Sequence, residues 1–155
     1  MLHLEAALLQ NNERTPDWLL TDSKGLFETG LRYGWYVDGQ PGLVYTHDWD
    51  KKPVTHNRLH WTVAESCSTA ASLLKRTGDL TYERWYRTLW DDFANYLIDQ
   101  KNGSWWHELD AENNPSSVVW SGKPDIYHAW QLTLNSRLPL APTLGTAVKL
   151  GLDRL

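Results

Sequence analysis

Apolar residues recur at helical spacing along most of the chain and predict six helices. The first apolar face begins at Leu2, with no N-cap residue ahead of it. Thr15 and Pro16 have the positions of an N-cap and a first helical residue, and Gly78 is placed to end a helix. The predicted helices cover roughly residues 2–9, 16–34, 57–76, 81–100, 124–138 and 143–152.

Two long connections interrupt this helical pattern. Residues 43–46 and 52–54 flank a turn-like Asp-Trp-Asp-Lys at 48–51, which predicts a short hairpin. Residues 103–110 are bounded by turn formers, and we expect them to pair with the apolar run at 118–120. Structured loops of this length in a compact helical domain usually carry function.

The order of helices and loops predicts an array of three helix pairs, an all-α architecture. Each pair occupies some 30 to 50 residues, the period typical of αα-hairpin arrays. In such arrays the long loops emerge at one end. We therefore expect the 35–57 and 101–123 segments to lie over the same rim.

Length and charge limit the kinds of partner. The 155 residues suffice for one domain, and we treat 1–155 as one domain or part of one. The net charge of −4 comes without a basic run, which argues against nucleic acid and anionic membranes. No apolar stretch has the ~20 residues of a transmembrane helix. The single cysteine, Cys67, is a small core residue or a nucleophile, and it fits a reducing compartment such as the cytoplasm.

The aromatic composition is unusual. The chain has 10 Trp and 7 Tyr but only 2 Phe, so most large rings carry a polar group. Such rings suit surfaces that bind polyhydroxylated ligands, because they offer an apolar face and a hydrogen-bonding edge. They equally suit wide seams between helices.

Two histidines fall near predicted helix starts. His60 would lie within about the first turn of one helix and His128 about a turn into another. A helix N-terminus favours the neutral imidazole, and two such rings can remove and return a proton. Alternatively, each histidine caps a loop or meets a backbone carbonyl. Zinc is a rival reading through His56, His60 and His107-Glu108, although the chain lacks HExxH and a cysteine cluster.

Other polar and aromatic side chains could contact a ligand. Glu65 would either pair with Arg58 or bind sugar hydroxyls. Trp105-Trp106 with Glu108 has the pattern of stacking rings beside a hydroxyl acceptor, or of a hairpin plug. Glu65 and Glu108 are also the one pair of carboxylates that could serve a glycoside hydrolase.

Three segments together resemble the N-acylglucosamine 2-epimerase superfamily. They are RLHWTVAE at 58–65, GSWWHELD at 103–110 and GKPDIYHA at 122–129. Within that superfamily they are most similar to the aldose–ketose isomerase branch, which includes mannose and sulfoquinovose isomerases. His60 stands where epimerases tend to have the first of two tryptophans, and this favours the isomerase branch.

The resemblance implies an (α/α)6 barrel, of which the three helix pairs would be the C-terminal half. It implies that His60 and His128 are the acid/base pair that interconverts an aldose and a 2-ketose through a cis-enediol, without metal or other cofactor. It also implies that Arg58, Glu65, Trp105, Trp106 and Glu108 hold a sugar substrate.

The chain is less than half as long as members of this family. We therefore expect a fragment with little or no turnover, whose exposed inner helices favour self-association. A C2 epimerase and a carbohydrate-binding fragment without catalysis remain as alternatives.

Overall fold

The computed structural model describes residues 1–124 and 126–152, and most of them are helical. The elements are α1 (Leu2–Gln10), α2 (Asp17–Gly34), β1 (Thr46–His47), β2 (Pro53–Thr55), β3 (Arg58–Leu59), α3 (His60–Thr77), α4 (Leu80–Asp92), the π-helix η1 (Phe93–Leu97), β4 (Glu108–Leu109), α5 (Tyr127–Arg137) and α6 (Leu144–Leu152). The predicted helix pairs are thus α1–α2, α3–α4 and α5–α6. Asp125, where the fifth helix was expected to open, lies outside the described residues.

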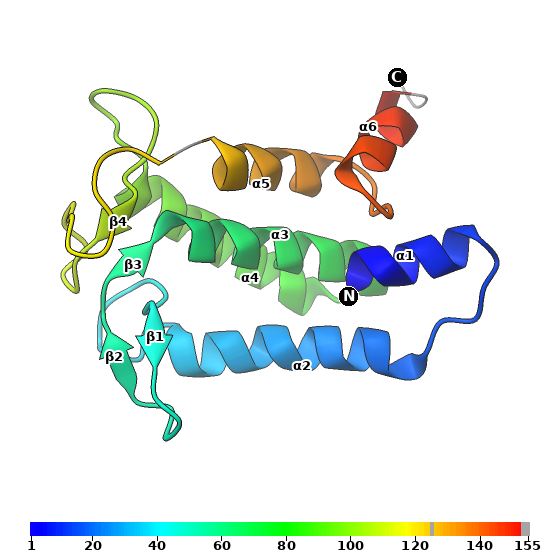
Figure 1. The fold of residues 1–155 in the computed structure, drawn as a ribbon, viewed down its shortest axis with the longest axis horizontal. Coiled ribbons are helices and arrows are strands. Elements are labelled where there is room, and N and C mark those ends of the chain that lie inside the picture. The colour runs from blue at the N-terminus through cyan, green and yellow to red at the C-terminus, as the bar shows by residue number, and fades with distance from the viewer. Residues whose placement is uncertain (125, 153–155) are drawn as a thin grey trace.

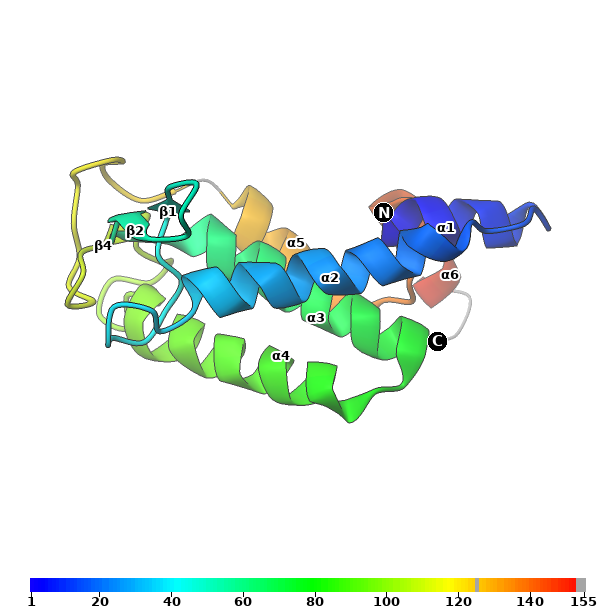
Figure 2. The same ribbon diagram turned by 90° about the horizontal axis from the view of Figure 1, so that it is seen from below.

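Helix α3 is the centre of the fold. It packs against α4, α5 and α2, with α5 and α2 on opposite sides of it in Figure 1 and α4 against one face of this layer in Figure 2. Small side chains let these helices approach closely, and those buried on α3 include Ala64, Cys67, Ala70 and Ala71. Larger core residues from the surrounding elements complete the packing, including Phe27, Leu31, Leu89, Phe93, Leu97 and Leu132.

Helix α1 is fixed by polar contacts. The Arg76 guanidinium forms a two-pronged ion pair with the Glu5 carboxylate, with N–O distances of 2.8 and 2.9 Å. The His3 ring contacts the Ala141 carbonyl oxygen at 2.6 Å. Glu5 is only 2% exposed, so its charge is matched within the fold. These contacts tie the beginning of the chain to the end of α3 and to the segment before α6.

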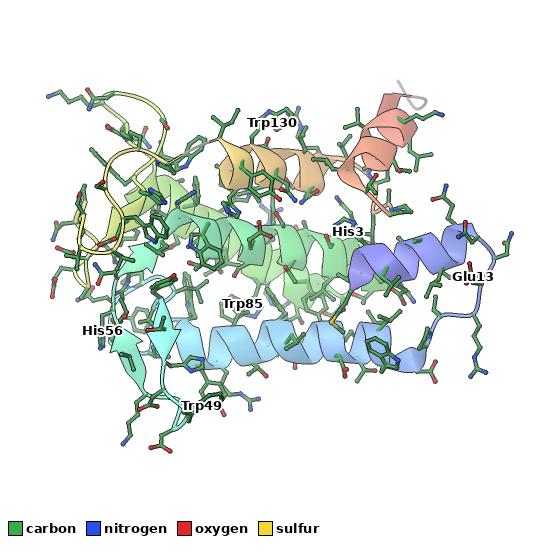
Figure 3. All side chains as sticks on the ribbon, viewed as in Figure 1. His3, Glu13, Trp49, His56, Trp85 and Trp130 are labelled. Carbon is green, nitrogen blue, oxygen red and sulfur yellow. The ribbon has the colours of Figure 1, made fainter. Side chains whose placement is uncertain are left out.

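All four strands lie at the end of the helices where α3 and α5 begin (Figure 1). The predicted hairpin is confirmed, because β1 and β2 pair antiparallel. Its turn carries Trp49, which points away from the body of the molecule and is 96% exposed (Figure 3). The loops at 35–57 and 101–123 therefore share one rim, as the helix-pair pattern predicts.

The second predicted hairpin is wrong. Strand β4 does not pair with residues 118–120 but with β3, so that Arg58 faces Leu109 and Leu59 faces Glu108. This pairing also delays the start of α3, which begins at His60 and not near Asn57. The fourth helix ends earlier than predicted, because the chain turns at Ile98, which makes a bridge to Trp105.

Candidate active site

His60 is the first residue of α3 and sits directly after β3. Its backbone N–H donates to the His107 carbonyl oxygen at 3.2 Å, and its Nδ1 lies 3.4 Å from the same oxygen. The carbonyl directly before β4 therefore contacts both the start of the helix and the ring. A tautomer protonated at Nδ1 fits this contact and puts the basic lone pair on Nε2.

His128 is the second residue of α5, and its ring lies beside that of His60. The two ring centroids are 5.8 Å apart and the ring planes are 73° from parallel. The structure thus brings together two histidines that are 68 positions apart, as expected from the shared rim. His60 is 2% exposed, whereas the His128 side chain is 29% exposed, so the histidine pair opens to solvent on the His128 side.

Glu65 is the partner of His128. One carboxylate oxygen lies 2.9 Å from His128 Nδ1, and the two residues come from α3 and α5. The expected alternative, an ion pair between Glu65 and Arg58, does not form. A carboxylate on Nδ1 fixes the proton there and leaves Nε2 as the basic nitrogen, as in other carboxylate–histidine pairs.

Aromatic rings surround the two histidines. The ring centroids of Trp61 and Tyr127 lie 5.9 and 4.8 Å from the ring centroid of His128. The ring centroids of His107 and Trp105 lie 5.0 and 6.4 Å from the ring centroid of His60. Trp105 therefore belongs to the site, and its indole Nε1 is buried without a hydrogen-bond partner among residues 1–124 and 126–152.

Arg58 does not reach the site. It is 1% exposed, and its Nη2 makes a 2.6 Å ion pair with Asp38, while Nε donates to the Pro41 carbonyl at 3.1 Å. A further donor contact goes to the carbonyl oxygen of His56. Burial tends to raise the pKa of Asp38, but the hydrogen bonds from Arg58 and His56 hold it below its usual value. Its guanidinium is engaged in fixing the 38–56 loop, and no contact between Arg58 and the histidine pair is described.

Glu108 is likewise engaged within the protein. It is fully buried, and its carboxylate accepts five hydrogen bonds, from Asn57, Ser116 and the backbone N–H groups of 118–120. A carboxylate with both oxygens occupied can neither accept from a sugar hydroxyl nor serve a glycosidase as an acid or base. The same bonds explain why 118–120 forms no strand, since its N–H groups point to a side chain instead.

The Trp106 ring is in contact with Lys123, whose Nζ lies 3.8 Å from the ring centroid. Lys123 also forms a 2.5 Å ion pair with Asp99, which joins the segment before α5 to the loop after η1. Trp106 is therefore placed in a cation–π contact and not beside the histidines.

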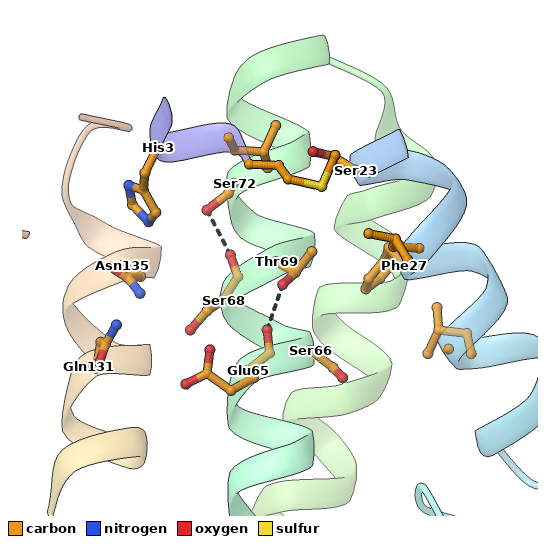
Figure 4. A pocket seen from close by; sticks show the side chains of 15 residues that line it. His3, Ser23, Phe27, Glu65, Ser66, Ser68, Thr69, Ser72, Gln131 and Asn135 are labelled. Atoms are coloured by element: carbon orange, nitrogen blue, oxygen red, sulfur yellow. Dashed lines mark hydrogen bonds between the residues drawn. The ribbon is translucent and has the colours of Figure 1, made fainter. Parts of the chain in front are cut away.

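A cavity of about 460 Å³ runs along α3 from Glu65 toward α1. Figure 4 shows its wall of hydroxyl and amide groups from α3 and α5, facing Ser23 and Phe27 of α2. The cavity is not lined by His60 or His128, and Glu65 is the residue that the cavity and the histidine pair share. Several of the α3 hydroxyls donate to the carbonyl four residues earlier, as Ser66, Thr69 and Ser72 do.

The histidine and acidic side chains form no metal site in the part of the chain that the structure describes. His56 lies outside α3, and its Nδ1 contacts Asp38 at 2.9 Å. The i, i+4 spacing of His56 and His60 therefore does not put them on one helical face. Within the same described residues, no helix has the length and hydropathy that a bilayer crossing requires.

The comparison with protein-family models covers most of the chain. A family model described as N-acylglucosamine 2-epimerase (GlcNAc 2-epimerase) matches residues 1–132. The chain belongs to this family.

Relatives within the family are isomerases by name. The D-mannose isomerase of Pseudomonas cannabina pv. alisalensis is 54% identical over 153 residues, which are 99% of this chain and 37% of that protein. The D-mannose isomerase of Thermobifida fusca is 50% identical over 149 residues, which are 96% of this chain and 36% of that protein. The chain thus spans little more than a third of these relatives' length.

Two solved structures share the fold. A crystal structure of D-mannose isomerase superposes with a TM-score of 0.74 at 28% identity, covering 87% of this chain and 34% of that one. A sugar epimerase from a ruminal bacterium matches with a TM-score of 0.52 at 21% identity over 61% of this chain and 24% of that one, which shows the fold alone. The three helix pairs are part of an α/α toroid, as predicted.

Two features in and around the site were not predicted from the sequence. Asp38, the partner of Arg58, lies in a loop whose only signal was its turn-forming residues. Trp120 stacks on the His107 ring, with centroids 5.4 Å apart and planes 19° from parallel, although the sequence predicts a strand at 118–120.

Proposed function

We propose that this chain carries the acid/base histidines of a sugar aldose–ketose isomerase that interconverts mannose and fructose. The observation that supports it most is the contact between the His60 and His128 rings, which come from the starts of two different helices. The names of the relatives, D-mannose isomerases at 54% and 50% identity, support the choice of substrate.

The proposed reaction moves one proton between neighbouring carbons of the open-chain sugar. One imidazole takes the proton from C2 of mannose, a cis-enediol forms, and the other imidazole returns a proton to C1, giving fructose. C1 and C2 are about 1.5 Å apart. Two rings in contact with each other can therefore serve both carbons from one side of the sugar.

Glu65 has the position to orient His128 in this reaction. Its carboxylate on Nδ1 leaves Nε2 as the basic nitrogen and stabilises the ring when it carries a second proton. Trp105 and Trp61 are the rings placed to contact the sugar, because each lies against one of the two histidines. We propose Arg58 and Glu108 as supports of the surrounding loops, with no direct contact to substrate.

Epimerisation at C2 is the second candidate, because the family description names an epimerase. It would begin with the same removal of the C2 proton, but the proton would return to the opposite face of C2. The side-by-side placement of the two imidazoles supports isomerisation over this outcome. A carbohydrate-binding role without catalysis is the third, and it would leave sugar binding intact with no proton transfer.

A segment exchange tests the proposal. The matching segment of the Thermobifida fusca D-mannose isomerase is replaced by this chain, and conversion of mannose to fructose is measured. We expect turnover in the chimera, its loss in His60→Gln and in His128→Gln, and little or no turnover by the 155-residue chain alone. Full activity in either variant would refute the assigned roles, and formation of glucose would identify an epimerase.

We also propose that the chain self-associates in a reducing compartment. Large apolar side chains that stay exposed support association, among them Trp18, Leu26 and Trp130. The single cysteine is buried and has no disulfide partner, which supports the compartment. Sedimentation of the chain as a monomer at micromolar concentration would contradict the association.

A further inference from the structure

The segment 116–120 crosses the rim with its large apolar side chains exposed. Val118 is 81% exposed, Val119 39% and Trp120 49%. Burial of apolar surface therefore does not explain the position of this loop. Polar contacts must hold it, and among the described residues they converge on Glu108.

The Glu108 carboxylate is the anchor of that loop. Oε1 accepts from Asn57 Nδ2 at 2.7 Å, from Ser116 Oγ at 2.8 Å and from Val118 N at 3.0 Å. Oε2 accepts from the backbone nitrogens of Val119 and Trp120, each at 2.7 Å. Three consecutive N–H groups thus point to one carboxylate, which is fully buried. Bonds of this length to an ionised acceptor are about twice as strong as neutral ones.

The charge state of Glu108 agrees with this geometry. Burial alone would raise its pKa, but hydrogen bonds from Trp120, Ser116, Val119 and Val118 bring it below the usual value. The carboxylate is therefore ionised at neutral pH, and all five groups around it can act as donors.

Trp120 connects the loop to the histidine pair. Its ring stacks on the His107 ring, and the His107 ring in turn lies 5.0 Å from that of His60. The His107 carbonyl is also the oxygen that the backbone N–H and Nδ1 of His60 both approach. A displaced His107 would therefore alter the orientation and the hydrogen bonding of His60 together.

We infer that Glu108 is a positioning residue for the histidine pair: its carboxylate fixes the 116–120 loop, Trp120 thereby holds His107, and His107 holds His60. The inference rests on the proposed function only in treating His60 as catalytic. It assigns to Glu108 a role at a distance from the sugar, in place of the direct contact expected from sequence.

The test compares Glu108→Gln with Asp110→Asn in the 155-residue chain. The first change keeps the shape of the side chain but turns one acceptor oxygen into an NH₂ donor that faces N–H groups. Asp110 is a matched control on the same segment. Its carboxylate also accepts backbone N–H groups, from Glu112 and Asn114, but it serves the adjacent turn and not the 116–120 loop.

The readout is the NMR spectrum of labelled imidazole and indole groups, assigned by single substitutions. In Glu108→Gln we expect the ring signals of His60, His107 and Trp120 to shift, and those of the distant His3 to stay. Chymotrypsin cleavage after Trp120 should rise at least about tenfold, the factor equivalent to losing one hydrogen bond to a charged group. Asp110→Asn should change none of these.

Unchanged His60 and His107 signals in folded Glu108→Gln would overturn the inference. Should that variant fail to fold, Trp120→Ala decides, because it keeps the Glu108 carboxylate and removes only the stacked ring. It should shift His107 and His60, and a spectrum in which neither moves would overturn the inference as well.

The NMR result does not depend on turnover, so it separates this inference from the proposed function. If the chimera converts no mannose while Glu108→Gln still shifts His60, the isomerase proposal fails and the positioning role stands. If the chimera is active, Glu108→Gln should lower kcat on the order of 10²-fold with a smaller change in KM. Asp110→Asn should leave both close to the unchanged chimera.

Discussion

Asp92 gives a prediction about stability that the structure makes quantitative. It is the last residue of α4 and is 7% exposed, and its Oδ1 has no hydrogen-bond partner among the described residues. Burial raises the pKa of Asp92 to about 6 from 3.8, although the positive charge of Arg58 works in the other direction. An ionised carboxylate at this place therefore costs stability at neutral pH.

Proton linkage gives the direction and the size of the effect of pH on stability. Between about pH 4 and pH 6 the unfolded chain loses the Asp92 proton while the folded chain keeps it, so stability falls as pH rises through this range. Above the folded pKa the loss is complete. A shift of about 2 pKa units corresponds to about 3 kcal/mol. Asp92→Asn removes the titrating group and should recover most of this at pH 7.5, with little effect at pH 4.

Urea unfolding at several pH values measures the effect. With a urea m-value of about 2 kcal/mol per molar, a 3 kcal/mol gain moves the midpoint by about 1.5 M. Asp99→Asn is the matched control, because Asp99 is also buried but accepts bonds from Lys123 and Asn102, which lower its pKa. That variant should lose stability at pH 7.5. An Asp92→Asn variant that is no more stable than the original chain at pH 7.5 would refute the reasoning.

Three further substitutions and one control test the packing. Arg58→Leu should cost about 3–5 kcal/mol in urea unfolding, because it removes the buried guanidinium that pairs with the Asp38 carboxylate; Arg87→Ala, from an exposed pair, should cost much less. Leu73→Ala, in the fully buried centre of α3, should lower the unfolding free energy by about 2–5 kcal/mol, and a loss below 1 kcal/mol would contradict the packing described. Gly78→Ala should cost about 1–2 kcal/mol, because the residue after α3 has a φ of +71°, which alanine rarely adopts. An added Cβ would meet no neighbour within 4 Å, so the cost is one of backbone conformation. An unchanged thermal midpoint would argue against the left-handed helix end.

The fold was largely predictable from sequence because local signals determine it. Helical spacing of apolar residues marked the helices, and Gly78 marked the end of α3 correctly. The position of the strands was less predictable, since β3 and β4 are two residues each and pair across 48 intervening positions. Nothing local indicates that Leu59 faces Glu108, and this pairing decides where α3 begins.

The site was predictable in its histidines and not in its carboxylates. Helix starts and the shared rim led to the contact of His60 and His128, which depends on fold topology alone. Whether a buried acid meets a ligand, a cation or backbone N–H groups depends on loop conformation. Glu108 therefore turned out to be a loop anchor, Glu65 the partner of His128, and Arg58 the partner of Asp38.

The most direct test of the account is the fate of the transferred hydrogen. Mannose is incubated in heavy water with the chimera that carries this chain, and the fructose formed is analysed by NMR. The account predicts deuterium at C1 of fructose, because the two imidazoles exchange protons with solvent, and no label transfer when either His60 or His128 is changed to Gln. Fructose formed without any deuterium, or labelled equally well in both variants, would contradict it.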